Sequence, residues 1–109
     1  MKVAISSKGA GLGAWMEPVL GQCGFLVVVT EDRDFFAIEN SNRESADFNE
    51  LALVKDAVAQ GINALIAGSM AELTKTYLQE NSIKVYQAQQ GSVLELVELL
   101  LDGKLPLMQ

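Results

Sequence analysis

Short apolar runs alternate with polar turns along the chain. The run Phe25–Thr30 ("FLVVVT") is continuously apolar, and Ile62–Gly68 ("INALIAG") is apolar except for Asn63. Both are typical of strands buried on both faces. Shorter runs rich in apolar residues predict three further strands, at Lys2–Ser6, Phe35–Asn40 and Ile83–Ala88. Because only the polar turn "EDRD" separates the second strand from the third, we expect these two to form an antiparallel hairpin.

Helical spacing of apolar residues predicts three helices. The first has its apolar residues on one face, at Phe48, Leu51, Val54 and Val58. It follows a polar loop in which Ser45 or Asp47 could cap it, and Gly61 ends it. The pairs Ser69–Glu72 and Ser92–Glu95 have the spacing of capping boxes, so each predicts the start of a further helix.

The resulting element order is β-β-β-α-β-α-β-α, which predicts an α/β fold. Hairpins come first and parallel crossovers follow, so we expect a five-stranded mixed sheet flanked by helices. The 109 residues fit one domain, 1–109, and half of them are apolar, which is enough to form a core without disulfides.

Charge and composition disfavour several classes of function. The net charge of −6 disfavours nucleic acid and anionic membranes as partners, since both are bound through Lys and Arg. The chain has no histidine and hence no usual general base, so a conventional hydrolase is disfavoured. With no signal peptide at the start, no apolar run long enough for a membrane span and a single cysteine, we expect a cytoplasmic protein.

The glycine-rich segment after the first strand, "SSKGAGLGAWMEPVLGQCGF", carries the candidate chemistry. Gly9, Gly11 and Ala14 match the pattern G-x-G-x-x-A, and acidic residues follow about twenty positions later, as in dinucleotide-binding units. Pro18 interrupts the helix that such a unit needs, so this interpretation is disfavoured. The alternatives are a plain loop or an anion-binding nest of backbone N–H groups beside Lys8.

Two other positions have a structural and a functional interpretation. Cys23 precedes a buried strand, which favours a small hydrophobic role, but its flanking glycines could expose the thiolate to a soft metal. One thiolate is too few to hold a metal centre alone. The Gly68–Ser69 turn is either an ordinary helix cap or an anion site at the end of a parallel strand.

The order of several segments resembles the dinitrogenase iron–molybdenum cofactor biosynthesis family, of the type found in NifX and at the C-terminus of NifB. The resemblance covers nearly the whole chain and rests on "MKVAISSKGAGL", "EPVLGQCGFLVVV", "AIEN", "GINALIAG", "IKVYQA" and "GSVLELVELLLDGKL". Three segments depart from the family pattern, and the histidine that relatives use for a cluster is absent from this chain. Gln22 replaces an arginine, "RESADFNE" replaces a glycine-rich run, and "GSMAEL" keeps only Gly68 of its turn.

The resemblance implies a ribonuclease H-like fold and a non-enzymatic carrier of an iron–sulfur or molybdenum-containing cluster, with cluster donor and acceptor proteins as partners. It suggests Cys23 as the metal ligand. The cofactor-binding residues that we expect are Lys8, Gly9, Gly11, Gly13, Gly21, Gly68 and Ser69.

Two alternatives remain. One is a cofactor-free interaction module or homodimer that uses the apolar last helix, "VLELVELLL", which contains Leu99. The other is nucleotide binding through Gly9–Ala14.

Overall fold

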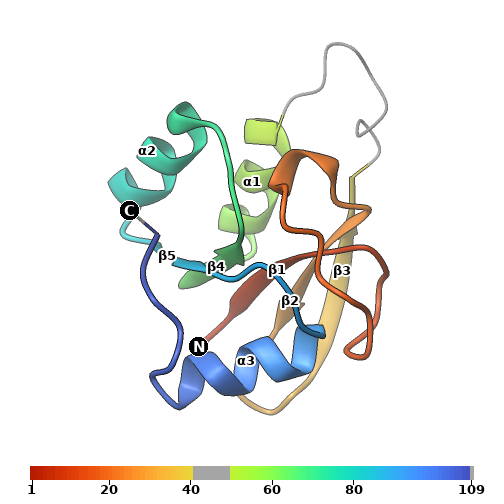
Figure 1. Ribbon diagram of the computed structural model, residues 1–109. Coiled ribbons are helices and arrows are strands. Elements are labelled where there is room, and N and C mark those ends of the chain that lie inside the picture. The colour runs from red at the N-terminus through yellow and green to blue at the C-terminus, as the bar shows by residue number, and fades with distance from the viewer. Residues whose placement is uncertain (41–49, 109) are drawn as a thin grey trace.

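The computed structural model describes residues 1–40 and 50–108 (Figure 1). Its elements follow the predicted order of strands and helices, with one short 3₁₀ helix, η1, added between the first two strands. In chain order they are β1 (Val3–Ser7), η1 (Leu20–Gln22), β2 (Phe25–Val29), β3 (Phe35–Glu39), α1 (Glu50–Ala59), β4 (Ala64–Ala67), α2 (Glu72–Glu80), β5 (Lys84–Gln87) and α3 (Val93–Leu101).

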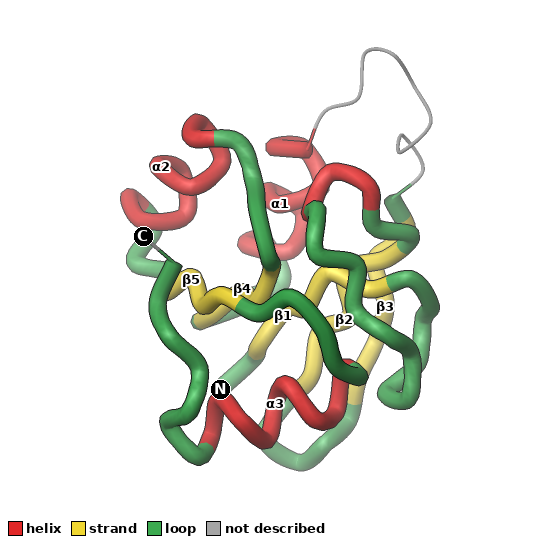
Figure 2. Tube along the Cα trace, viewed as in Figure 1, coloured by secondary structure: helices red, strands yellow, loops and turns green. Residues whose placement is uncertain are grey.

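The five strands form one mixed sheet in the order β3-β2-β1-β4-β5. The pairs β1–β2 and β2–β3 are antiparallel, whereas β1–β4 and β4–β5 are parallel. Helices α1 and α2 cover one face and α3 covers the other (Figures 1 and 2). Every residue of β1 and β4 is therefore buried, which is why their sequences are so continuously apolar.

Alternate side chains of the strands enter two separate cores. Ala4 and Leu65 pack with α1 and α2, while Val3 and Ile5 pack with α3. In α1 the buried residues are Leu53, Val54 and Ala57. Of the predicted α1 face, Val54 is buried, Leu51 and Val58 are half-buried, and Phe48 lies outside the described residues, as do the cap candidates Ser45 and Asp47. The predicted face therefore missed Leu53 and Ala57.

The start of α3 confirms one capping-box prediction. The Ser92 hydroxyl accepts a hydrogen bond from the Glu95 N–H at 3.2 Å, and the Glu95 carboxylate accepts one from the Ser92 N–H at 3.1 Å. The N–H groups of Ser92 and Glu95 are thus both satisfied within four residues of sequence. This cap is encoded locally.

The second capping-box prediction is wrong. Helix α2 begins at Glu72 with Ala71 as its N-cap, and no side chain caps it locally. Instead, the Ala71 N–H donates to the Glu50 carboxylate of α1 at 3.0 Å. Ser69 is still part of an extended segment, where it forms a bridge with Val19. The start of α2 therefore depends on a contact distant in sequence and not on the local Ser69–Glu72 spacing.

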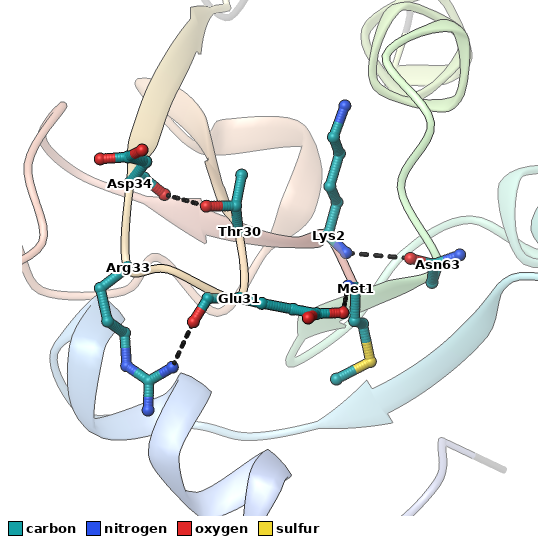
Figure 3. Close-up of polar contacts among 7 residues, drawn as sticks. All are labelled: Met1, Lys2, Thr30, Glu31, Arg33, Asp34 and Asn63. Carbon is teal, nitrogen blue, oxygen red and sulfur yellow. Dashed lines mark hydrogen bonds and ion pairs between the residues drawn. The ribbon is translucent and has the colours of Figure 1, made fainter.

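The β2–β3 turn lies at the end of the sheet where β1 begins (Figure 3). The N-terminal amine of Met1 forms an ion pair with Glu31, and Arg33 adopts a positive φ of 65° in the turn. Since β2 runs antiparallel to β1, Glu31 is at the opposite end of β1 from Gly9. No acid of this turn can reach a ligand held at Gly9–Ala14, so the geometry disfavours dinucleotide binding.

Candidate functional site

The loop between β1 and β2, residues Lys8–Gly24, folds across the end of the sheet at which the parallel strands β1 and β4 finish. Its middle continues the sheet beside β1. The Lys8 N–H donates to the Trp15 carbonyl at 2.9 Å, and the Glu17 N–H donates to the Ser6 carbonyl at 3.0 Å. The crevice expected at the ends of parallel strands is therefore filled by the chain itself.

The Gly68–Ser69 turn contacts this loop directly. The N–H groups of Gly68 and Ser69 both donate to the carbonyl of Pro18, at 2.8 and 2.9 Å, and the Ser69 carbonyl accepts from the Leu20 N–H at 3.1 Å. The turn has the form of a small anion nest, but a backbone carbonyl of the same chain occupies it. An external anion could use these two donors only by displacing Pro18.

Cys23 lies in the core beneath α1 and α2. Its side chain is fully buried in a cluster that includes Leu20, Leu26 and Val54. Burial raises the pKa of the Cys23 thiol from 9.0 to about 11, although the N–H of Ser7 and the side chain of Asn40 partly oppose this shift. At neutral pH the thiol is protonated, which favours the structural role of Cys23 over the metal-binding one.

Asn40, at the end of β3, holds the segment around Cys23 in place. Its side-chain amide donates to the carbonyl of Cys23 at 2.9 Å and to the carbonyl of Gly21 at 3.3 Å. Gly21 therefore presents its carbonyl to the protein interior. Asn40 is itself buried. Sequence reasoning missed this residue because nothing near position 40 signals a contact with residues 21 and 23.

The first half of the loop, Lys8–Gly13, is organised differently. Its carbonyls are used by neighbouring groups: the N–H groups of Val93 and Leu94 donate to Ala14 and Leu12 at 2.9 and 3.0 Å, and the Ser7 hydroxyl donates to Gly9 at 2.7 Å. The first turn of α3 thus finds its acceptors in this loop. These bonds fix the loop against α3.

The N–H groups of the same segment largely lack acceptors. The Lys8 N–H donates to Trp15 and the Gly9 N–H to the Ser7 hydroxyl at 3.2 Å. Within residues 1–40 and 50–108, we find no acceptor for the four consecutive N–H groups of residues 10–13. The Lys8 side chain is exposed, and Gly11 and Gly13 have open space beyond their α-carbons. This segment therefore offers hydrogen-bond donors to a ligand from solution.

A bare metal ion is usually held by several acidic, cysteine or histidine side chains. Within the part of the chain that the structure describes, no three acidic, cysteine or histidine residues lie together in a suitable group. Two surface cavities, of about 400 and 350 Å³, lie at the other end of the sheet and share Ser82 and Lys84 as lining residues. Of the expected site residues, Lys8, Gly9, Gly11 and Gly13 are thus brought together, while Gly21, Gly68, Ser69 and Cys23 make internal contacts.

The fold and the loop define a small α/β protein. It has helices on both faces of a mixed sheet and a glycine-rich segment at the end of the sheet where the parallel strands finish. The family described as dinitrogenase iron-molybdenum cofactor matches residues 1–103, and the chain belongs to this family. No curated protein matches the chain significantly. Among the described residues, no helix has the length and apolar character needed to cross a membrane.

Solved structures share the fold. The apo form of the orange protein from Desulfovibrio gigas is 24% identical, with a TM-score of 0.88 over 98% of this chain and 92% of that one. A DUF35-family protein from Thermotoga is 23% identical, with a TM-score of 0.84 over 97% of this chain and 91% of that one. At these identities the likeness concerns the fold alone.

Proposed function

We propose that this protein is a non-enzymatic carrier that transiently holds an iron–sulfur or molybdenum-containing cluster during iron–molybdenum cofactor assembly. Its partners would then be cluster donor and acceptor proteins, and it would work in the cytoplasm. Membership of the family supports this role. The sheet order β3-β2-β1-β4-β5 supports the further proposal that the fold is ribonuclease H-like.

The observation that carries this proposal is the row of N–H groups at residues 10–13, beside the exposed Lys8. Clusters of this kind are commonly anionic, and a chain with a net charge of −6 repels anions unless donors are concentrated locally. Consecutive backbone N–H groups supply such donors without requiring a metal–ligand bond. Gly11 and Gly13, which have open space where a β-carbon would lie, would let the cluster approach the backbone closely, whereas Gly9 packs against Ala14.

Cys23 has no direct role in this form of the proposal. Its sulfur is buried and its pKa of about 11 keeps the thiol protonated, so coordination would require the segment around η1 to open. Gly68 and Ser69 would take part only after losing the Pro18 carbonyl. The cluster is therefore expected to be held by hydrogen bonds and charge at Lys8–Gly13.

Anaerobic reconstitution with iron, sulfide and molybdate tests this proposal. After gel filtration, the metal content and visible spectrum of the wild type are compared with those of Lys8→Glu, Cys23→Ala and Lys104→Glu. Lys104 is an exposed lysine beyond the other end of α3, so its variant carries the same charge change away from the loop. We expect Lys8→Glu to lower retained metal several-fold, since it replaces attraction by repulsion next to the donors.

Retention should be normal in Lys104→Glu and Cys23→Ala, and it should weaken with added salt. A wild type that retains no metal would contradict the carrier role. Loss of metal in a folded Cys23→Ala variant, with normal retention in Lys8→Glu, would instead move the site to the thiol.

A cofactor-free interaction module is the second candidate. The observation that favours it is the exposure of two leucines of α3, Leu99 and Leu101, in a helix whose other face is buried. Leu99→Glu should then reduce binding to a protein partner without changing metal retention.

A further inference from the structure

The two edges of the sheet differ in how they are covered. Along β5, the segment before the C-terminus adds a short antiparallel stretch: the Gln87 N–H donates to Pro106 at 2.8 Å, and the Met108 N–H donates to Val85 at 2.9 Å. Tyr86 and Leu107 form the bridge between these bonds. Strand β3 is the outermost strand at the opposite edge (Figure 1), and no described segment pairs with its outer side.

The register with β2 defines which groups of β3 face outward. The Asn40 N–H donates to Gly24 and the Thr30 N–H to Asp34, both at 2.9 Å, so the even-numbered residues exchange hydrogen bonds with β2. In an antiparallel ladder the intervening residues point their N–H and C=O groups the other way. Among the residues that the structure describes, the backbone N–H and C=O groups of Phe35, Ala37 and Glu39 therefore have no partner and point away from β2.

Several features that normally prevent strand pairing are absent from this edge, although it carries one charged residue, Glu39. Its five residues pair one to one with β2 without a bulge, and none is lysine or proline. Two aromatic side chains lie on it, Phe35 at 45% exposure and Phe36 at 37%, and they belong to opposite faces of the strand. An unprotected apolar edge of this kind is a ready site for β-strand addition.

We propose that two copies of this chain associate through β3, antiparallel to each other, about a two-fold axis at Ala37. In this register each outward N–H of one copy meets an outward C=O of the other. Phe36 lies opposite the partner's Ile38, which places apolar side chains together on one face. Phe35 lies opposite the partner's Glu39, so the only charged residues of the two strands do not meet each other.

The state of the two edges favours a second copy as the occupant. A head-to-tail arrangement would need a free β5 edge, but residues 106–108 cover that edge. Two-fold pairing of β3 with β3 leaves both covered edges outside, so the assembly stops at a dimer. One five-residue strand is a small interface, so we expect a dissociation constant on the order of 10–100 µM.

Sedimentation velocity over a range from 1 µM to 1 mM tests the interface, with Ala37→Pro as the variant and Ala37→Val as its control. Proline removes the outward N–H of residue 37 and is tolerated where that N–H faces solvent. We expect wild type and Ala37→Val to dimerise and Ala37→Pro to associate at least ~10-fold more weakly. A wild type that stays monomeric at 1 mM would overturn the proposal, as would a dimer that persists in Ala37→Pro and disappears in Leu99→Glu.

Amide hydrogen exchange of the wild type gives a second test that depends on no variant. The amides of Phe35, Ala37 and Glu39 should exchange fast at low protein concentration and more slowly at high concentration. Those of Phe36 and Ile38 should be protected at both, because β2 already binds them. Equal exchange rates of the three outward amides at both concentrations would refute the pairing, even if Ala37→Pro failed to fold.

Discussion

The backbone N–H of Gly68 donates a hydrogen bond to the carbonyl of Pro18 at 2.8 Å, and Pro18 also fills the space that a side chain at residue 68 would need. A β-carbon on Gly68 would lie 2.8 Å from the Pro18 Cβ, 2.9 Å from the Pro18 oxygen and 3.0 Å from the Ala88 oxygen. The turn after β4 and the loop after β1 are thus packed backbone against backbone. This contact covers the end of the sheet at which the parallel strands finish.

Gly68→Ala should therefore destabilise the protein. Two of the three blocking atoms are backbone oxygens, which can move only if the loop shifts, so we expect a loss of about 1–3 kcal/mol in the free energy of unfolding. Urea denaturation followed by circular dichroism measures it. Gly11→Ala is the matched control, because nothing lies within 4 Å of a β-carbon there. Equal midpoints for the two variants would contradict the close contact.

Asn40→Ala should also destabilise the protein, for a different reason. The variant removes the donor that satisfies the carbonyls of Cys23 and Gly21, and a buried carbonyl left without a donor costs about 1–3 kcal/mol. Asn40→Asp, which places an acceptor against the Cys23 carbonyl, should be at least as unstable at pH 7. Part of that loss should return at pH values that protonate the carboxyl group, which then donates. Stability of Asn40→Ala equal to wild type would show that water replaces the amide.

Local signals in the sequence were sufficient for most of the fold. All five predicted strands are present. Strands β1, β2 and β4 are buried on both faces and so have few polar positions, whereas β3 and β5 are partly exposed. The Ser92–Glu95 box was predictable because both partners of its hydrogen bonds lie within four residues. The start of α2 was not, since the group that binds the Ala71 N–H is Glu50, twenty-one residues away.

The candidate site was predictable only in part. Glycine spacing predicted Lys8–Gly13 as part of the site. Which N–H groups of this segment stay free depends on how it packs against α3, whose first turn donates hydrogen bonds to the carbonyls of Leu12 and Ala14. The glycines beside Cys23 suggested an accessible thiol. These glycines do not expose the thiol, because the Asn40 side chain binds the Cys23 carbonyl and Leu20 packs in the same buried cluster as Cys23. Such contacts join residues whose pairing no local pattern encodes.

Ser92→Ala should lower stability by about 1 kcal/mol, the usual cost of losing an N-cap side chain. The effect should be visible as a fall of several degrees in the melting temperature. Glu95→Gln is the control, because a glutamine oxygen can still accept from the Ser92 N–H and should retain most of the stability. A loss in Glu95→Gln as large as in Ser92→Ala would mean that charge at the helix start dominates over the hydrogen bonds.

The buried thiol of Cys23 should make stability depend on alkaline pH. Burial raises its pKa from 9.0 to about 11 in the folded state, so the unfolded chain loses this proton first. The contribution is fully present below pH 9 and is lost as pH rises from 9 to 11, and it amounts to at most ~2–3 kcal/mol. Urea denaturation of wild type and Cys23→Ala at a series of pH values isolates it.

The difference in unfolding free energy between these two proteins should be constant below pH 9 and shrink above it, because the thiol is the only ionisable group in which they differ. A difference that stays constant up to pH 11 would mean that the thiol is not held protonated by the core. Alkylation gives an independent check at pH 8, where iodoacetamide should modify the folded protein far more slowly than the urea-unfolded chain. Rapid alkylation of the folded state would place the thiol within reach of solvent and, with it, of a metal.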